Sequence, residues 1–83
     1  MIHALVRELT INGIAPSYIE QVSDTLTYIG FCKPGTKTDN DSKWCIKKVE
    51  QIGAITQTTF AEGSTSFNLQ WSQRTNYGYT FRI

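Results

Sequence analysis

Two aspartates in the segment "KTDNDS", Asp39 and Asp41, lie close enough in the sequence to do chemistry together. They could form an acid–base pair or bind Ca²⁺. A calcium-binding loop, however, needs further oxygen ligands at alternating positions and a bidentate glutamate at its end, and no residue here stands at the required offset. We therefore expect this segment to be an exposed polar loop.

The chain contains one histidine, His3, and two cysteines, Cys32 and Cys45, which lie 13 residues apart (45 − 32 = 13). A zinc site is not expected, because there is a single histidine and no CxxC pair. His3 has no serine or cysteine context that suggests a nucleophile. The cysteine spacing would allow a disulfide, but "MIHALVRELT" does not read as a signal peptide, so we expect both thiols to be reduced. The residues thus predict no enzyme, no cofactor and no metal.

Several aromatic side chains could stack on bases or sugars, or could form the core of a small β domain, namely Tyr28, Trp44, Trp71, Tyr77 and Tyr79. We favour the core, because the aliphatic content is modest and aromatic residues bury large areas. Arg74 follows Trp71 by three residues. It is expected to bond backbone carbonyls or to stack on an aromatic ring.

The length and the net charge of the chain limit the classes of protein to which it can belong. The 83 residues suffice for one domain, 1–83, with a core so small that partners would add to its stability. The net charge of +1 argues against a protein dedicated to phosphate backbones. Five lysines between positions 33 and 48 share one stretch with Asp39, Asp41 and Glu50, which indicates a solvated loop and strand face. No stretch approaches the roughly 20 apolar residues that span a membrane.

Three strands are predicted in the middle of the chain. Residues 25–32, "TLTYIGFC", are rich in β-branched and aromatic residues and end at the turn "KPGT". Residues 43–51 form the next strand, with Trp44 and Ile46 on one face and Cys45, Lys47 and Val49 on the other. After a turn at 52–54 the third strand runs to Glu62–Gly63, as an antiparallel hairpin.

The C-terminal part predicts one or two helical turns followed by a strand. Ser64 or Ser66 could cap the helix, whose one face would carry Phe67, Trp71 and Arg74. The last strand is expected from about residue 77 to residue 83. Its alternation places Tyr77, Tyr79, Phe81 and Ile83 on one face and Gly78, Thr80 and Arg82 on the other.

The first 24 residues leave alternatives open. "ALVRELTING" fits a helical turn or a strand, and the segment after Pro16 fits a short helix or an extended arm. The predicted fold is mainly β, a small antiparallel sheet or sandwich of four to five strands with one short helix before the C-terminal strand.

Three segments, "TYIGFCKPGT", "KWCIKKVE" and "TTFAEGSTSFNLQWSQRTNYGYT", resemble a family of small virion-associated proteins of tailed bacteriophages. The resemblance covers about residues 25–80, with two departures, at Ser72, where an aspartate is usual, and at Cys45. It rests on a Tyr-Ile-Gly strand, a Pro-Gly-Thr turn, a Trp-x-Ile-Lys-Lys strand, an acidic-Gly turn, a Trp-x-x-Arg helix and a Tyr-Thr ending.

The resemblance implies a non-enzymatic structural protein of the phage head, neck or tail, located in the virion. It would bind larger virion proteins and copies of itself. Residues 25–83 would be the β core, and residues 1–24, which lie outside the match, would be a candidate attachment arm. The alternative is a small binding module, for host glycans through Trp71 and Tyr77 or for single-stranded nucleic acid through the lysines of the second strand. The residues expected to serve structure or interaction are Tyr28, Trp44, Phe67, Trp71, Arg74, Tyr77, Tyr79, Thr80, Phe81 and Arg82.

Overall fold

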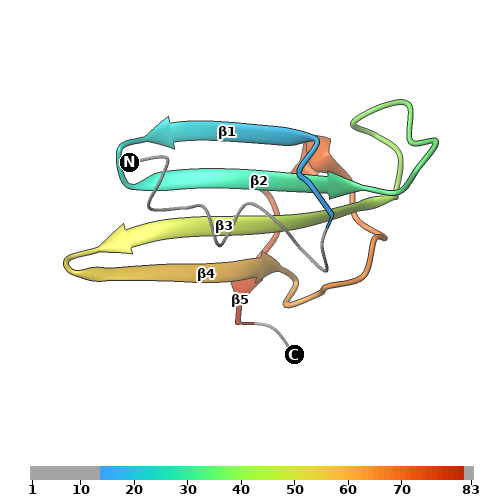
Figure 1. The fold of residues 1–83 in the computed structure, drawn as a ribbon. Helices are drawn as coiled ribbons and strands as arrows, with labels where there is room; N and C mark the ends of the chain where they lie inside the picture. The colour runs from blue at the N-terminus through green and yellow to red at the C-terminus, as the bar shows by residue number, and fades with distance from the viewer. Residues whose placement is uncertain (1–13, 82–83) are drawn as a thin grey trace.

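Five antiparallel strands form a single sheet in the order β1-β2-β3-β4-β5 (Figure 1). The structure is a computed structural model, and it describes residues 14–81. The elements are β1 (Tyr18–Ser23), β2 (Leu26–Cys32), β3 (Trp44–Ile52), β4 (Ile55–Ala61), the 3₁₀ helix η2 (Trp71–Gln73) and β5 (Tyr79–Thr80). The predicted fold class is confirmed: a small antiparallel sheet with one short helical turn before the last strand.

The turns between the central strands follow from their residues. Pro34 and Gly35 form the turn after β2, in which the Thr36 amide donates to the Lys33 carbonyl at 3.2 Å and Gly35 has a φ of 85°. That positive φ at the third turn position is the type II pattern. Between β3 and β4 the loop is only Gly53 and Ala54, with a φ of 61° at Gly53, as a type II′ hairpin requires.

Both faces of the sheet carry buried apolar side chains, as strand alternation predicts for β3. We call the face of Trp44 and Ile46 the tryptophan face. Its buried cluster consists of Tyr28, Trp44, Ile46, Ala61 and Trp71. We call the opposite face the phenylalanine face, and its buried cluster consists of Ile29, Phe31, Cys45, Val49 and Phe60.

Part of the segment whose fold was left open forms the edge strand β1. Residues Tyr18–Ser23 pair with β2, from Tyr18 opposite Gly30 to Ser23 opposite Leu26, with a register shift between Gln21 and Ser23. This portion of the candidate attachment arm therefore belongs to the sheet. The N-terminal part of the predicted arm, residues 1–13, lies outside the described residues. It includes His3.

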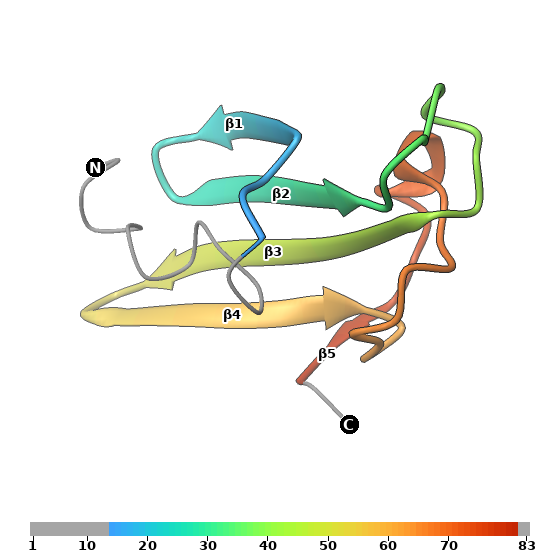
Figure 2. The same ribbon diagram turned by 45° about the vertical axis from the view of Figure 1, so that its right-hand side comes forward.

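The prediction that Phe67, Trp71 and Arg74 share one helical face is wrong. The helix is three residues long, and the chain before it is extended, with Leu69 bridging to Trp44 through two backbone hydrogen bonds of 2.9 and 3.0 Å. Phe67 therefore packs against the phenylalanine face and Trp71 against the tryptophan face. Ser64 caps no helix, since its hydroxyl accepts from the Ser66 amide instead. The segment crosses the end of the sheet where β2 ends and β3 begins (Figure 2).

The last strand is shorter than predicted. It comprises Tyr79 and Thr80, opposite Ala61 and Phe60 of β4, while Tyr77 precedes the strand. Phe81 is 67% exposed, so it does not continue the buried face of Tyr79. Arg82 and Ile83 lie outside the described residues. Pairing to β4 ends early because Glu62 has already turned the chain, at a φ of 57°, and its amide bonds the Gly78 carbonyl at 2.7 Å.

The two tryptophan rings lie directly over Gly30 in β2. A Cβ at this position would stand 2.6 Å from Cε3 and 2.7 Å from Cζ3 of Trp71, and 3.1 Å from Cε3 of Trp44. Tyr18, opposite Gly30 on β1, stacks on Trp44 with ring centroids 5.0 Å apart. The missing side chain thus lets three aromatic rings meet over one strand.

We predict that Gly30→Ala lowers the free energy of unfolding by about 1–3 kcal/mol, since the added methyl group overlaps rings held on every side. The control is Gly78→Ala, where a Cβ would lie at an ordinary 3.6 Å from the Glu62 carboxylate. Denaturant unfolding of both variants measures the difference. Equal losses in the two variants would contradict the packing described over Gly30.

Candidate interaction surface

The aromatic residues that sequence patterns singled out come together on the tryptophan face, but most of their ring area is covered. Trp44 is 3% exposed and Trp71 5%, and their centroids lie 5.8 Å apart. Tyr28 packs against Tyr79 at 5.7 Å. These rings form the core on this side of the sheet, and neither indole ring is exposed enough to stack on a base or a sugar.

The polar ends of these aromatic side chains bond the backbone. The Trp44 indole donates to the Thr38 carbonyl at 3.2 Å, and the Tyr79 hydroxyl donates to the Arg74 carbonyl at 2.7 Å. The Tyr77 hydroxyl accepts from the Gln70 amide at 2.9 Å. Burial raises the pKa of Tyr79 far above its usual value, so its hydroxyl stays a donor. The first two contacts hold loops onto the sheet, and the third joins two parts of the C-terminal segment, as is usual for buried aromatic residues with a polar end.

Arg74 joins η2 to the edge strand β1. Its Nε and Nη2 donate to Glu20 Oε1 and Oε2 at 2.8 and 2.9 Å, its Nη1 donates to the Trp71 carbonyl at 3.3 Å, and its guanidinium lies over the Trp71 ring at 4.8 Å. The carbonyl and ring contacts are those expected from the sequence. The bidentate partner Glu20 is 54 residues away, and no local pattern marks it.

The two aspartates of the polar loop have separate roles. The Asp41 carboxylate accepts from the Lys37 amide and the Thr38 hydroxyl, both at 3.0 Å, and these bonds lower its pKa. The Asp39 carboxylate instead forms a hydrogen bond with the Tyr18 hydroxyl and raises the pKa of Tyr18. The loop therefore uses its carboxylates to close itself and to contact β1.

The lysines of the second predicted strand point to opposite faces of the sheet. Lys47 is 6% exposed, and its ammonium lies 5.7 Å from the Phe31 ring and 5.9 Å from the Phe60 ring. Lys48 lies over the Tyr79 ring at 4.7 Å and pairs with Glu50 at 3.5 Å. Because neighbours in a strand face opposite ways, these two cations do not form one basic patch.

The two thiols are free, and the register explains why. Cys32 pairs with Trp44 and Cys45 pairs with Phe31, so the two cysteines occupy neighbouring rows and their side chains leave opposite faces of the sheet. A disulfide requires Cβ atoms that point toward each other. Burial raises the pKa of Cys45 to about 11, whereas the half-buried Cys32 lies 3.1 Å from the Ser17 hydroxyl.

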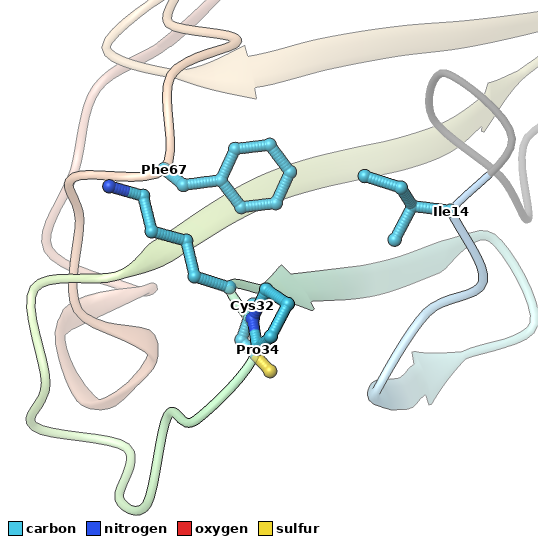
Figure 3. A pocket seen from close by; sticks show the side chains of 5 residues that line it. Ile14, Cys32, Pro34 and Phe67 are labelled. Carbon is cyan, nitrogen blue, oxygen red and sulfur yellow. The ribbon is translucent and has the colours of Figure 1, made fainter.

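A small apolar pocket lies beside Cys32, on the side of the sheet where Phe67 packs (Figure 3). The Phe67 and Ile14 side chains point toward each other across it, and Pro34 and Cys32 close one side. Its volume is about 210 Å³, and the lining residues are Ile14, Cys32, Lys33, Pro34 and Phe67. Within residues 14–81 no group of three or more potential metal ligands comes together, and no helix there is long and apolar enough to cross a membrane.

The exposed large apolar side chains lie mainly at the ends and edges of the sheet. Tyr18, Ile19 and Val22 belong to β1, Ile52 and Ile55 flank the β3–β4 loop, and Ile14 and Phe81 lie near the ends of the described chain. Of the predicted interaction residues, Thr80 and Phe81 are exposed, and Arg82 lies outside the described residues. Residue patterns did not mark β1 or the tip of the β3–β4 hairpin as a surface with exposed apolar side chains. For the tip, the lack of charged residues in 51–57 was a signal in the sequence.

Comparison with known proteins returns no relative. No protein-family model matches this chain, and no curated protein or solved structure matches it significantly. The candidate surface therefore rests on the geometry alone.

We predict that Glu20→Gln weakens the fold by about 0.5–1 kcal/mol near neutral pH, because the Glu20 side chain is 40% exposed and solvent screens part of the attraction. Arg74 lowers the pKa of Glu20 from its ordinary 4.5. A lowered carboxyl pKa stabilises the folded state above the unfolded pKa, and the gain is lost as pH falls through the folded value. Unfolding curves between about pH 6 and about pH 3 should show a smaller pH-dependent loss in Glu20→Gln than in the wild type.

The control for this pair is Glu50→Gln, which breaks a single contact of 3.5 Å between neighbours on one strand. It should cost less than Glu20→Gln, since Glu20 accepts two hydrogen bonds from Arg74 and so joins β1 to the segment that follows η2. A pH dependence unchanged in Glu20→Gln would contradict the assigned role of this ion pair.

For the cysteines we predict two distinct reactivities. In the native protein a thiol reagent should modify Cys32 and spare Cys45, because Cys45 is fully buried and its pKa is about 11. In denaturant without reductant both thiols should titrate. Mass spectrometry of the modified peptides identifies the site, and modification of Cys45 before Cys32, or an absence of free thiols, would contradict the prediction.

Proposed function

We propose that this chain is a non-enzymatic structural subunit of a tailed-phage particle, which binds larger virion proteins and is located in the virion. The resemblance of residues 25–80 to small virion-associated proteins suggests the setting. The observation that carries the proposal is the tip of the β3–β4 hairpin. It projects beyond the β1–β2 turn (Figures 1 and 2). It also carries two exposed apolar side chains, Ile52 and Ile55.

Ile52 and Ile55 form the last pair of this hairpin and lie directly opposite each other. They are 53% and 65% exposed. Because paired residues point to the same side of a sheet, the two side chains make one apolar knob. The surrounding run 51–57, "QIGAITQ", has no charged residue. Depletion of charge around apolar anchors is the composition found at the centre of protein interfaces.

The geometry of the hairpin suits insertion into a concave surface. The loop is two residues long and its first residue, Gly53, has the positive φ that a tight turn needs, so the tip is held by backbone pairing up to Ile52 and Ile55. A knob that is already ordered loses little conformational entropy on binding. Neither nucleic acid nor membrane is part of this proposal.

No observation favours the alternative binding modules. Recognition of glycans through Trp71 would need an open ring face, and Trp71 is 5% exposed. Recognition of single-stranded nucleic acid through the lysines of β3 would need them on one side, and Lys47 and Lys48 point to opposite sides.

Mass spectrometry of purified particles of the phage that encodes this chain tests the proposal. We expect the wild-type chain in the particles and a loss of at least about tenfold in copy number for the Ile52→Lys/Ile55→Lys variant, because charged side chains would have to enter an apolar site. The matched control is Thr65→Lys/Thr75→Lys, which adds the same two charges at exposed positions outside the hairpin. Absence of the wild-type chain from particles, or equal incorporation of all variants, would overturn the proposal.

A further inference from the structure

We propose that the open edge of β1 pairs with β1 of a second copy, which joins two sheets into one continuous antiparallel sheet across a two-fold axis. This inference deepens the proposed function, because it names the partner of a second surface. It concerns the isolated chain and is tested without particles.

The first step is that, among residues 14–81, β1 is an edge strand with no other strand on its outer side. It pairs with β2 along one side, and five of its six residues are exposed, with Glu20 half-buried. Tyr18 is 43% and Ile19 44% exposed, and they point to opposite faces. A strand edge presents unpaired N–H and C=O groups that can bond another strand.

The second step is that β1 lacks the charge that usually protects an edge. Natural edge strands carry lysines, prolines or unpaired charges that prevent association. The sequence of β1 is "YIEQVS", and its one ionisable carboxylate, Glu20, is held by two hydrogen bonds of 2.8 and 2.9 Å from Arg74. Its charge is therefore compensated within the same chain.

The third step concerns symmetry and favours a second copy as the occupant. A two-fold axis perpendicular to a sheet brings two identical edges together antiparallel and places one residue opposite its own counterpart. With the axis at Ile19, the two isoleucines face each other on the phenylalanine side, and Tyr18 lies opposite Glu20 of the second copy. No like charges meet, and the net charge of +1 per chain adds little repulsion.

The register limits the strength of the pairing. The shift between Gln21 and Ser23 leaves Tyr18–Gln21 as the regular part of the edge. Pairing of so short a strand buries less than the roughly 1,200 Å² of a stable interface, so the dimer should dissociate on dilution. In a particle, other contacts of the same subunit would add to it.

Sedimentation velocity of the full chain over a range of concentrations tests the inference. We expect the average mass to rise with concentration from 9.4 kDa toward twice that value. Ile19→Lys and Ile19→Glu should each weaken association by about tenfold or more, because each places like charges opposite one another. An equimolar mixture of these two variants should associate again. Ile55→Lys, the same substitution on the hairpin tip, should dimerise like the wild type.

Circular dichroism shows whether the variants fold. NMR spectra of the isotope-labelled wild-type protein, recorded on dilution, test the association without any variant. Dilution should shift the amide signals of residues 18–21 and leave those of the hairpin tip unchanged. A wild-type chain that stays monomeric up to millimolar concentration would overturn the inference. So would a mixture of folded Ile19→Lys and Ile19→Glu chains that fails to associate, or an equal loss of association in Ile55→Lys. Failure of particle incorporation alone would contradict the proposed function and leave this result unaffected.

Discussion

Gly30 of β2 has no side chain, and the rings of Trp71 and Trp44 occupy the space where one would lie. The Tyr18 ring packs against both of them. The contact is tight enough that a methyl group would stand 2.6 Å from the Trp71 ring. Trp71 can sit there only because η2 crosses the end of the sheet, and η2 is held there by Arg74 and Glu20. The placement of the edge strand and of the C-terminal segment therefore depends on one residue that lacks a side chain.

A single sheet with two apolar faces needs covering on both sides, which is demanding for 83 residues. The segment after β4 contributes to both, since Phe67 reaches the phenylalanine face and Trp71 the tryptophan face. Glu62 makes this path possible, because its positive φ turns the chain, its amide donates to the Gly78 carbonyl and its carboxylate accepts from the Gly78 amide at 3.0 Å. These contacts give a structural reason for an acidic residue at this position of the acidic-Gly turn.

Since Tyr28, Trp44 and Trp71 are buried in the core, the surfaces that we propose for partners are a strand edge and a hairpin tip. These carry few charges, and the ionisable groups nearby are paired within the chain. Such a division suits a subunit that is ordered before it assembles, because the binding elements are already held by backbone pairing and lose little freedom on contact. The two surfaces lie on different elements, the β3–β4 tip and the β1 edge, so the two contacts that we propose do not compete for the same residues.

Local patterns in the sequence determined the central part of this protein. Alternation of residue types in 43–51 predicted which side chains of β3 share a face. The Pro-Gly, Gly53 and Glu-Gly turns predicted where β2, β3 and β4 end, because these turns depend on the φ of one or two residues. Burial of Trp44 and Trp71 as core also followed from composition.

Tertiary structure alone decided what the ambiguous segments became. Residues 18–23 are a strand because they pair with the edge of β2, where Tyr18 lies opposite Gly30 and stacks on Trp44. Phe67 and Trp71 part to opposite faces because Leu69 pairs with Trp44 and keeps the chain extended. Glu20 meets Arg74 across 54 residues because the sheet places β1 beside η2, a closeness that no local pattern encodes.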